Sequence, residues 1–201
     1  MEKEIIDNHA RYLERIKLFK SFGYDADGER NFIIENVGPV SGEILEAGTG
    51  KGHFTIALAR KGFSFVSVDV SCDEQNFARM NIKYLGLEKQ VDFQISDAEN
   101  LHFEDNSFDN IFAVNLVHHL ENPFKVVDEM ARILNPGGKM VLSDFNKKGF
   151  EIIKKIHESE GGTHDEGKAG LKNVDEYLLL KGFTSKEYNT DLQQMFVFYK
   201  Q

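Results

Sequence analysis

Three glycines alternate directly behind a carboxylate at residues 46–52, where the sequence reads Glu-Ala-Gly-Thr-Gly-Lys-Gly. Glycine takes up positive φ angles without a Cβ clash, and its bare backbone lets a small molecule come close. The spacing Gly-x-Gly-x-Gly is one residue shorter than the Gly-x-Gly-x-x-Gly fingerprint of dinucleotide sites. The stretch predicts a sharp turn beside a ligand, although glycine clusters also close ordinary turns.

Two aspartates stand where later strands of the chain are expected to end. Asp69 follows Phe-Val-Ser-Val, and Asp97 with Ala98 follows a further apolar run. A carboxylate such as Asp69 can accept both hydroxyls of a ribose, or can simply favour a helix N-terminus. Asp97 can accept from an exocyclic amine while the Ala98 N–H meets a ring nitrogen, or it can be an ordinary turn aspartate. An adenosine-bearing ligand is predicted when the three features are taken together: the glycine turn, Asp69 for the ribose hydroxyls and Asp97 for the exocyclic amine.

A pair of histidines, His118 and His119, follows the fourth expected strand within Asn-Leu-Val-His-His-Leu. Imidazole titrates near neutral pH and serves as a general base when a nucleophile must lose a proton. Both histidines are therefore candidate catalytic residues, with His119 preferred.

An alternation of strands and helices positions these residues. Apolar periodicity and capping signals favour these segments. Helices are predicted over residues 2–20, 27–37, 53–60, 71–85, 123–134, 150–159 and 174–180, and strands over 43–47, 64–70, 91–96, 110–115, 139–145, 183–190 and 195–200. Such alternation indicates a parallel sheet with helices on both faces, closed by an antiparallel pair. Ligands on such sheets bind beyond the carboxyl ends of the strands, which is where the candidate residues fall.

Length and composition fit one globular α/β domain over residues 1–201, with a helical cap at 1–40 and a core at 41–201. The chain has 24 Lys and Arg against 33 Asp and Glu, a net charge of −9. We therefore expect neither nucleic acid nor an anionic membrane as a partner. Cys72 is the only cysteine, the first residues lack an apolar signal region, and no apolar run has transmembrane length. These features favour the cytoplasm.

Five blocks in order resemble those of the class I S-adenosylmethionine (SAM)-dependent methyltransferases, of the type 11 kind that acts on small molecules. The resemblance covers about residues 40–145. The blocks are the acidic glycine turn at 46–52, Val-Asp-Val at 68–70, Ser-Asp-Ala at 96–98, Leu-His-Phe-Glu-Asp-Asn-Ser-Phe-Asp at 101–109 and Leu-Asn-Pro-Gly-Gly-Lys at 134–139.

The resemblance implies a Rossmann-like, doubly wound, seven-stranded sheet, mostly parallel with an antiparallel C-terminal strand. It also implies SAM as cofactor and S-adenosylhomocysteine (SAH) as product. Asp69 would hold the ribose, and Asp97 with Ala98 would read the adenine edge. The full implied cofactor set is Glu46, Gly48, Thr49, Gly50, Gly52, Asp69, Val70, Asp97, Ala98, Asn115 and Leu116.

A small-molecule acceptor is expected, because the Asn-Pro-Pro-Tyr or Asp-Pro-Pro-Tyr motif of planar-amine methylation is absent after the fourth strand. In related enzymes the histidine pair is also a packing feature, which leaves its catalytic role open. The aromatic residues Tyr12, Phe19, Phe22 and Tyr24 and the loop 161–170 are expected to build the acceptor pocket. No metal site is expected, since His157, His164, Asp165 and Glu166 lack a firm ligand spacing.

Two other functions stay open at this point. A SAM-binding regulatory or scaffold protein without turnover would carry the same motifs. A nicotinamide-dependent oxidoreductase would also suit Asp69, but not the glycine spacing. The sequence does not indicate an oligomeric state.

Overall fold

The computed structural model describes residues 2–162 and 169–201. The helices are α1 (Lys3–Ser21), α2 (Ala26–Asn36), α3 (His53–Arg60), α4 (Cys72–Leu85), α5 (Pro123–Ile133), α6 (Lys147–Ser159) and α7 (Leu171–Leu180), with short 3-10 turns η1 (Glu88–Gln90) and η2 (Val117–His119). The strands are β1 (Ile44–Ala47), β2 (Phe65–Asp69), β3 (Val91–Ile95), β4 (Phe108–Val114), β5 (Leu134–Phe145), β6 (Thr184–Asn189) and β7 (Gln193–Tyr199).

The strands of the described chain form a seven-stranded sheet in the order β3-β2-β1-β4-β5-β7-β6. Strands β1 to β5 pair in parallel, while β7 runs antiparallel to both β5 and β6. This confirms the predicted doubly wound, mostly parallel sheet with an antiparallel C-terminal strand. The order reverses between β1 and β4, so the carboxyl ends of these two strands flank the crevice where ligands bind on such sheets.

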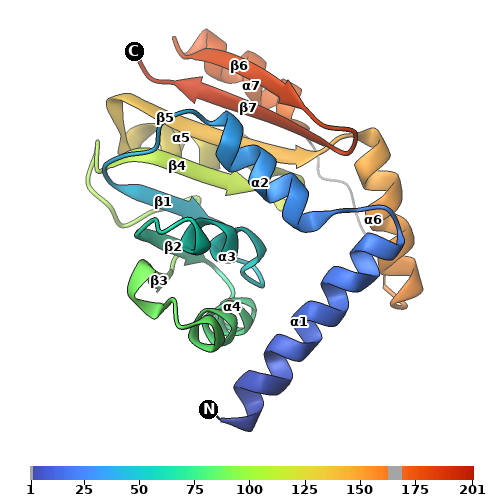
Figure 1. Ribbon diagram of the computed structural model, residues 1–201. Coiled ribbons are helices and arrows are strands. Elements are labelled where there is room, and N and C mark those ends of the chain that lie inside the picture. The colour runs from blue at the N-terminus through green and yellow to red at the C-terminus, as the bar shows by residue number, and fades with distance from the viewer. Residues whose placement is uncertain (1, 163–168) are drawn as a thin grey trace.

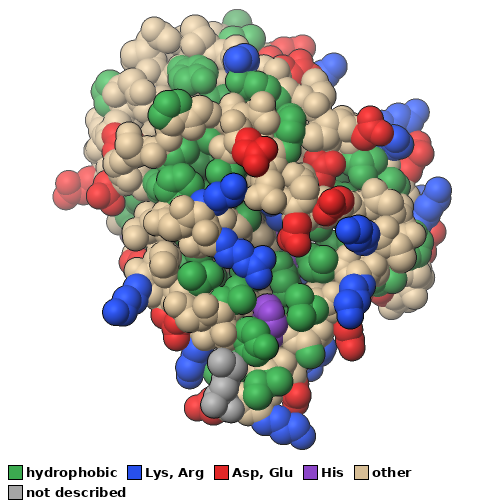
Figure 2. Space-filling model, in the orientation of Figure 1, with side chains coloured by type: hydrophobic (Ala, Val, Ile, Leu, Met, Phe, Trp, Pro, Cys, Tyr) green, Lys and Arg blue, Asp and Glu red, His purple; other side chains and the backbone are tan. Residues whose placement is uncertain are grey.

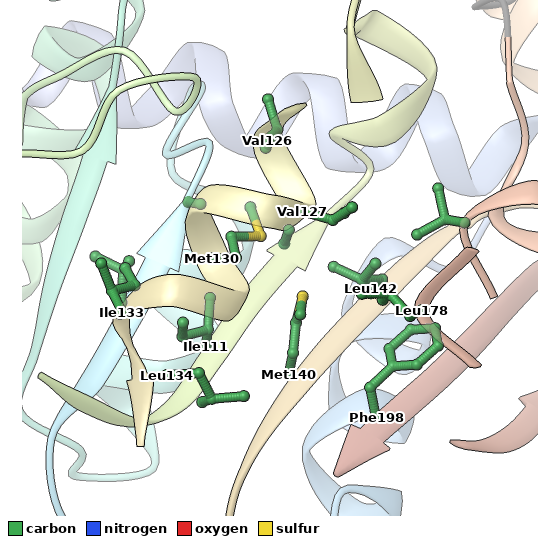
Figure 3. Packing of buried hydrophobic residues seen from close by; sticks show 14 of the residues in the cluster. Ile111, Val126, Val127, Met130, Ile133, Leu134, Met140, Leu142, Leu178 and Phe198 are labelled. Atoms are coloured by element: carbon green, nitrogen blue, oxygen red, sulfur yellow. The ribbon is translucent and has the colours of Figure 1, made fainter. Parts of the chain in front are cut away.

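Strand residues alternate between two cores because successive side chains point to opposite faces. Ile111 of β4 and Met140 of β5 pack with α5 and α7 on one face, as Figure 3 shows, while Phe112 and Val141 pack with α1 to α4 on the other. Figure 1 shows α2 and α3 in front of the sheet and α5 behind it. The sheet is thus covered on both faces, as expected for parallel strands.

A third buried cluster lies beyond the carboxyl edge of the sheet. It joins Phe19 of α1, Tyr24, Phe145 at the end of β5, and Ile153 of α6. Figure 1 shows α1 and α6 at the edge toward which the arrows of β1, β4 and β5 point. An ion pair between Arg15 and Glu160 also links α1 to the chain just after α6. Helices from both ends of the chain therefore cover the edge where the candidate residues lie.

Two elements, β5 and α6, begin at earlier residues than the sequence predicts. β5 begins at Leu134 rather than 139, because Leu134 pairs with Phe108 and the Gly137 N–H donates to the Lys200 carbonyl at 3.0 Å. α6 begins at Lys147 rather than 150, because the Asn146 side chain accepts from the third residue of the helix. Such side-chain caps satisfy amides that a helix leaves unpaired.

None of the helices in the described ranges is long and apolar enough to cross a membrane.

Candidate active site

The glycine turn after β1 is built from three residues with positive φ: Gly48 at 85°, Gly50 at 48° and Gly52 at 84°. A Cβ on Gly48 would lie 2.9 Å from the Leu116 side chain, and one on Gly52 would lie 2.7 Å from Ala78. Gly48 and Gly52 are therefore required by packing as well as by backbone conformation. A Cβ on Gly50 would meet nothing within 4 Å, so this glycine faces open space.

Glu46 lies beneath this turn, 1% exposed, at the centre of a polar network. Its Oε2 accepts from Ser67 at 2.6 Å and from Thr55 at 2.7 Å, while Oε1 is buried without a hydrogen-bond partner among the described residues. Burial raises the pKa of Glu46 to about 7, against the two hydroxyl hydrogen bonds that lower it. The Thr49 hydroxyl continues the network by bonding Ser67 at 2.6 Å.

Asp69, the last residue of β2, supports the same turn. One carboxylate oxygen accepts the Gly50 N–H at 2.7 Å, and the other accepts the Ser71 N–H at 2.8 Å. Ser71 caps α4, because its side chain accepts the Glu74 N–H. A half-buried carboxylate oxygen retains further acceptor capacity after one amide bond, so Asp69 can also receive ligand hydroxyls.

The chain turns sharply again after β4. Asn115 has a φ of 54°, which is uncommon for a residue other than glycine. Its N–H donates to Ser143 at 2.7 Å and its side-chain oxygen accepts from Gln193 at 3.1 Å. These bonds hold the strained turn, and the turn brings Leu116 against Gly48.

The two histidines that follow have different surroundings. His118 is 5% exposed, and its Nδ1 lies 2.5 Å from Oδ1 of Asp144 on β5. His119 is exposed, and its ring packs on that of His118 with centroids 3.9 Å apart. Sequence reasoning did not include Asp144, because its approach to His118 depends on the pairing of β4 with β5.

A cavity of about 320 Å³ lies at this edge of the sheet. Its volume falls within the range of small-molecule sites. It brings together eight of the predicted site residues: Gly48, Thr49, Gly50, Asp69, Asn115, Leu116, His118 and His119.

The other predicted site residues lie outside the cavity wall. Glu46 and Gly52 are buried behind the turn. Val70 is 72% exposed, Asp97 accepts from the Glu99 N–H at 2.9 Å, and Ala98 packs against the core cluster that includes Ile111 and Met140. The residues predicted to bind adenine therefore lie on an open surface beyond β2 and β3.

The cap contributes residues that sequence reasoning missed. Arg15 of α1 and Arg30 of α2 line the cavity together with Lys51 of the turn. Arg30 is 5% exposed, and its Nε has no hydrogen-bond partner among the residues that the structure describes. Local sequence patterns give no signal for Arg15 and Arg30, because these two residues reach the site only through the packing of α1 and α2 across the sheet edge.

Of the aromatic residues predicted for the acceptor pocket, Phe19 and Tyr24 line the cavity, while Tyr12 lines a neighbouring cavity of about 490 Å³. Phe22 instead packs against the third cluster. The ring of His53 lies against those of Tyr12 and Phe19 at the junction of the two cavities. Burial, followed by the charge of Arg30, holds the pKa of His53 well below its usual value.

Residues 2–162 and 169–201 contain no group of three or more His, Cys, Asp or Glu that could hold a metal ion. His157 lies on α6 and lines the cavity. His164, Asp165 and Glu166, with most of the predicted glycine-rich loop, fall outside the described residues.

Comparison with known proteins agrees with this geometry. A family profile described as "Methyltransferase domain" matches residues 45–142, the segment from β1 to β5 that carries the glycine turn, Asp69 and both histidines. This match and the named relatives support a class I SAM-dependent methyltransferase. It is 36% identical over 108 residues to "Methyltransferase GfsG" of Streptomyces halstedii, covering 53% of this chain and 39% of that protein. The chain spans 39%, 48% and 62% of the length of three such curated relatives.

Solved structures share this fold. A SAM-dependent methyltransferase from Aquifex aeolicus superimposes with a TM-score of 0.67 at 20% identity, covering 86% of this chain and 89% of that one. The [4+2]-cyclase SpnF superimposes with a TM-score of 0.55 at 26% identity, covering 59% of this chain and 44% of that one. The fold is thus shared with proteins of more than one reaction class.

The residues present fit the cofactor of this family, SAM. The backbone at Gly50 leaves open the space that a side chain would fill, and Asp69 lies beside it. Arg30, on the cavity wall, has a buried Nε donor without a hydrogen-bond partner in the described part of the chain. Asp69 and Arg30 are groups that bind ribose hydroxyls and a carboxylate, respectively.

Proposed function

We propose that this protein transfers a methyl group from SAM to a small-molecule acceptor. The observation that carries the proposal is the cavity at the carboxyl ends of β1, β2 and β4, walled by Gly48, Gly50, Asp69 and Asn115. The likeness to the methyltransferase family supplies the cofactor, and the Gly-x-Gly-x-Gly spacing differs from the fingerprint of dinucleotide sites. We take residues 1–201 as one domain, with 1–40 as its cap.

In this proposal Asp69 accepts the ribose hydroxyls, and Asp97 with Ala98 meets the adenine edge beside Val70. Gly48, Asn115 and Leu116 adjoin the amino-acid part of the cofactor, and Glu46 supports the turn from below through Ser67 and Thr55. Thr49, Gly50 and Gly52 shape the same turn.

Arg30 is the residue best placed for the carboxylate of the cofactor. It is buried, it lines the cavity, and it is held by hydrogen bonds to the Tyr24 hydroxyl at 3.1 Å and the Ala26 carbonyl. Its Nε has no other partner in the described part of the chain. A guanidinium so placed would gain a charge-assisted bond on binding a carboxylate.

SAM supplies an activated methyl group, and the protein supplies proximity, alignment and exclusion of water. Phe19, Tyr24, Phe145 and Ile153 of the third cluster line the cavity. His118 and His119 adjoin the same space and are the candidates for taking a proton from the acceptor.

A small acceptor suits the size of the cavity, which does not exceed that of ordinary small-molecule sites. Figure 2 shows acidic and basic side chains interspersed over one face, without the basic stripe that nucleic acid requires. The net charge of −9 also opposes binding to anionic membranes. We propose a cytoplasmic enzyme on this basis, together with the single cysteine.

The structural similarity to a [4+2]-cyclase favours a second candidate, a SAM-binding protein that performs no methyl transfer. A nicotinamide-dependent oxidoreductase has less support. Tyr177 and Lys181 stand in the Tyr-x-x-x-Lys spacing of some such enzymes, but both contact Asp128, at 2.8 and 2.5 Å, and neither lines the cavity.

Incubation of the protein with SAM and a panel of phenols, alcohols, amines and thiols tests the proposal. SAH formation and methylated acceptor are measured by mass spectrometry. We expect SAH and a methylated product to appear in equal amounts with one acceptor class. SAM binding without SAH formation across the panel would favour the second candidate.

A further inference from the structure

We propose that Asp144 holds His118 as the general base of this site, and that the acceptor presents a hydroxyl group. This inference rests on the proposed methyl transfer. It assigns a positioning residue, Asp144, on which sequence reasoning was silent. It also reverses the preference for His119.

The contacts between these two residues join η2, the turn that follows β4, to the end of β5. Oδ1 of Asp144 lies 2.5 Å from His118 Nδ1, while Oδ2 accepts the backbone N–H of His118 at 3.0 Å. Oδ1 also accepts the N–H of Phe145 at 2.9 Å. The carboxylate is therefore fixed on both sides, and it fixes the backbone and the ring of His118 together.

Burial distinguishes this pair from a surface contact. His118 is 5% exposed and Asp144 is 4% exposed. An aspartate in such a place accepts a proton-bearing nitrogen, so Nδ1 of His118 carries the hydrogen. The basic lone pair then belongs to Nε2, as in other Asp–His pairs that orient a base.

The position of His118 connects this nitrogen to the site. His118 lines both the cofactor cavity and a second cavity of about 450 Å³ that also includes Asp144 and the start of α6. It packs among Phe145, Phe150 and His119. His119 lines only the first of these cavities and is exposed. Because His118 is buried among aromatic rings, the fold controls the orientation of its imidazole. The exposed ring of His119 is less constrained.

The charged and titratable groups on the elements around His118 set the conditions under which it acts. Asp144 contacts it from β5, and His119 adjoins it on η2. On the walls of the two cavities stand Arg30, Lys147, His157 and Lys172. Asp144 is the anion in contact with the ring, so it is the group that would stabilise the imidazolium after proton transfer.

The reaction balances as follows. The acceptor O–H bond and the bond between the methyl carbon and the sulfonium sulfur break, and a bond forms between the acceptor oxygen and the methyl carbon. Sulfur keeps the electron pair and becomes a neutral thioether. The proton goes to Nε2 of His118 and then to solvent.

A hydroxyl is the acceptor class that needs a general base positioned in this way. A tertiary amine or a thioether has no proton to lose, and a neutral amine attacks through its lone pair before any proton leaves. A hydroxyl is a weak nucleophile until a base takes its proton, and a positioned base contributes about 10²–10⁴-fold to the rate.

Nitrogen-15 NMR of the histidine side chains tests the pair without any acceptor. In the full chain with SAH bound, we expect His118 to carry its hydrogen on Nδ1 and to move toward the Nε2–H form in Asp144→Asn. Asp128→Asn, which alters an acid on α5 remote from the cavity, is the matched control and should leave the His118 signals unchanged. A wild-type His118 protonated on Nε2 alone would overturn the assignment.

Kinetics with a phenol panel tests the acceptor class and the roles of the two histidines. We expect the kcat of Asp144→Asn and His118→Gln to fall about 100-fold or more, with the SAH dissociation constant unchanged, and His119→Gln to lose less activity than His118→Gln. Asp144→Glu, which keeps a carboxylate at this position, should recover part of the loss.

The outcomes distinguish failure of the His118–Asp144 base from failure of the proposed methyl transfer. Methylation of hydroxyls by Asp144→Asn at the wild-type rate would overturn the pair as a base while leaving the proposed function intact. Transfer to tertiary amines or thioethers alone would overturn the hydroxyl acceptor. No transfer by the wild-type chain to any class would count against the proposed function itself, and the NMR result would still decide whether Asp144 fixes the His118 tautomer.

Discussion

At the scale of single residues, the two carboxylates of the glycine turn have separate tasks. Asp69 bonds the backbone of the turn from its outer side and lines the cavity, whereas Glu46 lies underneath and bonds two hydroxyls. Sequence reasoning placed both in contact with the cofactor. Only the fold separates them, because burial depends on α3 and β2, which cover Glu46 from above and beside.

Asp69→Asn should weaken binding of SAH by about 1–3 kcal/mol, the usual loss when a charged acceptor of hydrogen bonds becomes neutral. Isothermal titration calorimetry measures the change. Asp73→Asn, exposed in the first turn of α4, is the matched control and should bind as the wild type does. Equal affinity of Asp69→Asn and wild type would show that Asp69 does not hold the ribose.

Glu46 makes stability depend on pH. Burial raises its pKa from 4.5 to about 7 in the folded chain, so its contribution is fully present below pH 4.5 and is lost as pH rises through 7. That loss amounts to about 3 kcal/mol. Glu46→Gln has no proton to lose, so the difference in unfolding free energy between it and wild type should move by about this amount in its favour between pH 4.5 and 8.

Urea unfolding at several pH values checks the Glu46 prediction. Glu43→Gln, at an exposed position just before β1, serves as control and should track wild type throughout. A constant difference between Glu46→Gln and wild type across the range would mean that Glu46 ionises at its ordinary pH in the folded chain.

At the scale of elements, the strand–turn–helix units were the most predictable part of the chain. The bounds of α3 agree with the prediction, and the core strands agree within a few residues, because alternation, glycines and capping residues are local signals. The start of β5 was wrong because Asn-Pro-Gly-Gly was read as a helix stop alone. Its pairing with Phe108 and Lys200 is a long-range interaction that the local pattern does not contain.

Gly52→Ala should destabilise the protein far more than Gly50→Ala. At Gly52 left-handed strain of about 1–2 kcal/mol adds to a Cβ contact of 2.7 Å with Ala78, whose overpacking costs about 1–3 kcal/mol more. At Gly50 only the strain applies, but the new methyl group enters the cavity and should lower SAH affinity.

Thermal unfolding and calorimetry on both glycine variants check this contrast. Gly86→Ala, which has a φ of 69° and open space for a Cβ, isolates the strain and should leave SAH binding intact. If Gly52→Ala proved no less stable than Gly86→Ala, the close packing of the turn on α4 would be refuted.

At the scale of the whole molecule, the cofactor half of the site follows from the β/α order and the acceptor half from the cap. The sheet order brings the ends of β1, β2 and β4 together, as the alternating pattern predicts. The cap adds Arg15, Arg30 and the aromatic cluster, whose placement depends on how α1 and α2 cross the sheet edge. No periodicity in residues 1–40 encodes that crossing.

The charge of the whole chain likewise differs from the charge inside the cavity. The chain is acidic overall, yet the cavity gathers Arg15, Arg30 and Lys51 beside Asp69 and Glu74. The net charge of the whole chain therefore bears on large partners such as nucleic acid and says little about the ligand in the cavity. A local excess of either sign within a cavity depends on tertiary packing.

The most direct test of the central claim is calorimetric titration of the unmodified chain with SAH and, in parallel, with NAD. The account predicts saturable binding of SAH at a single site and no binding of NAD at the same concentrations. Binding of NAD without binding of SAH would contradict it, because the glycine turn, Asp69 and Arg30 would then serve a dinucleotide.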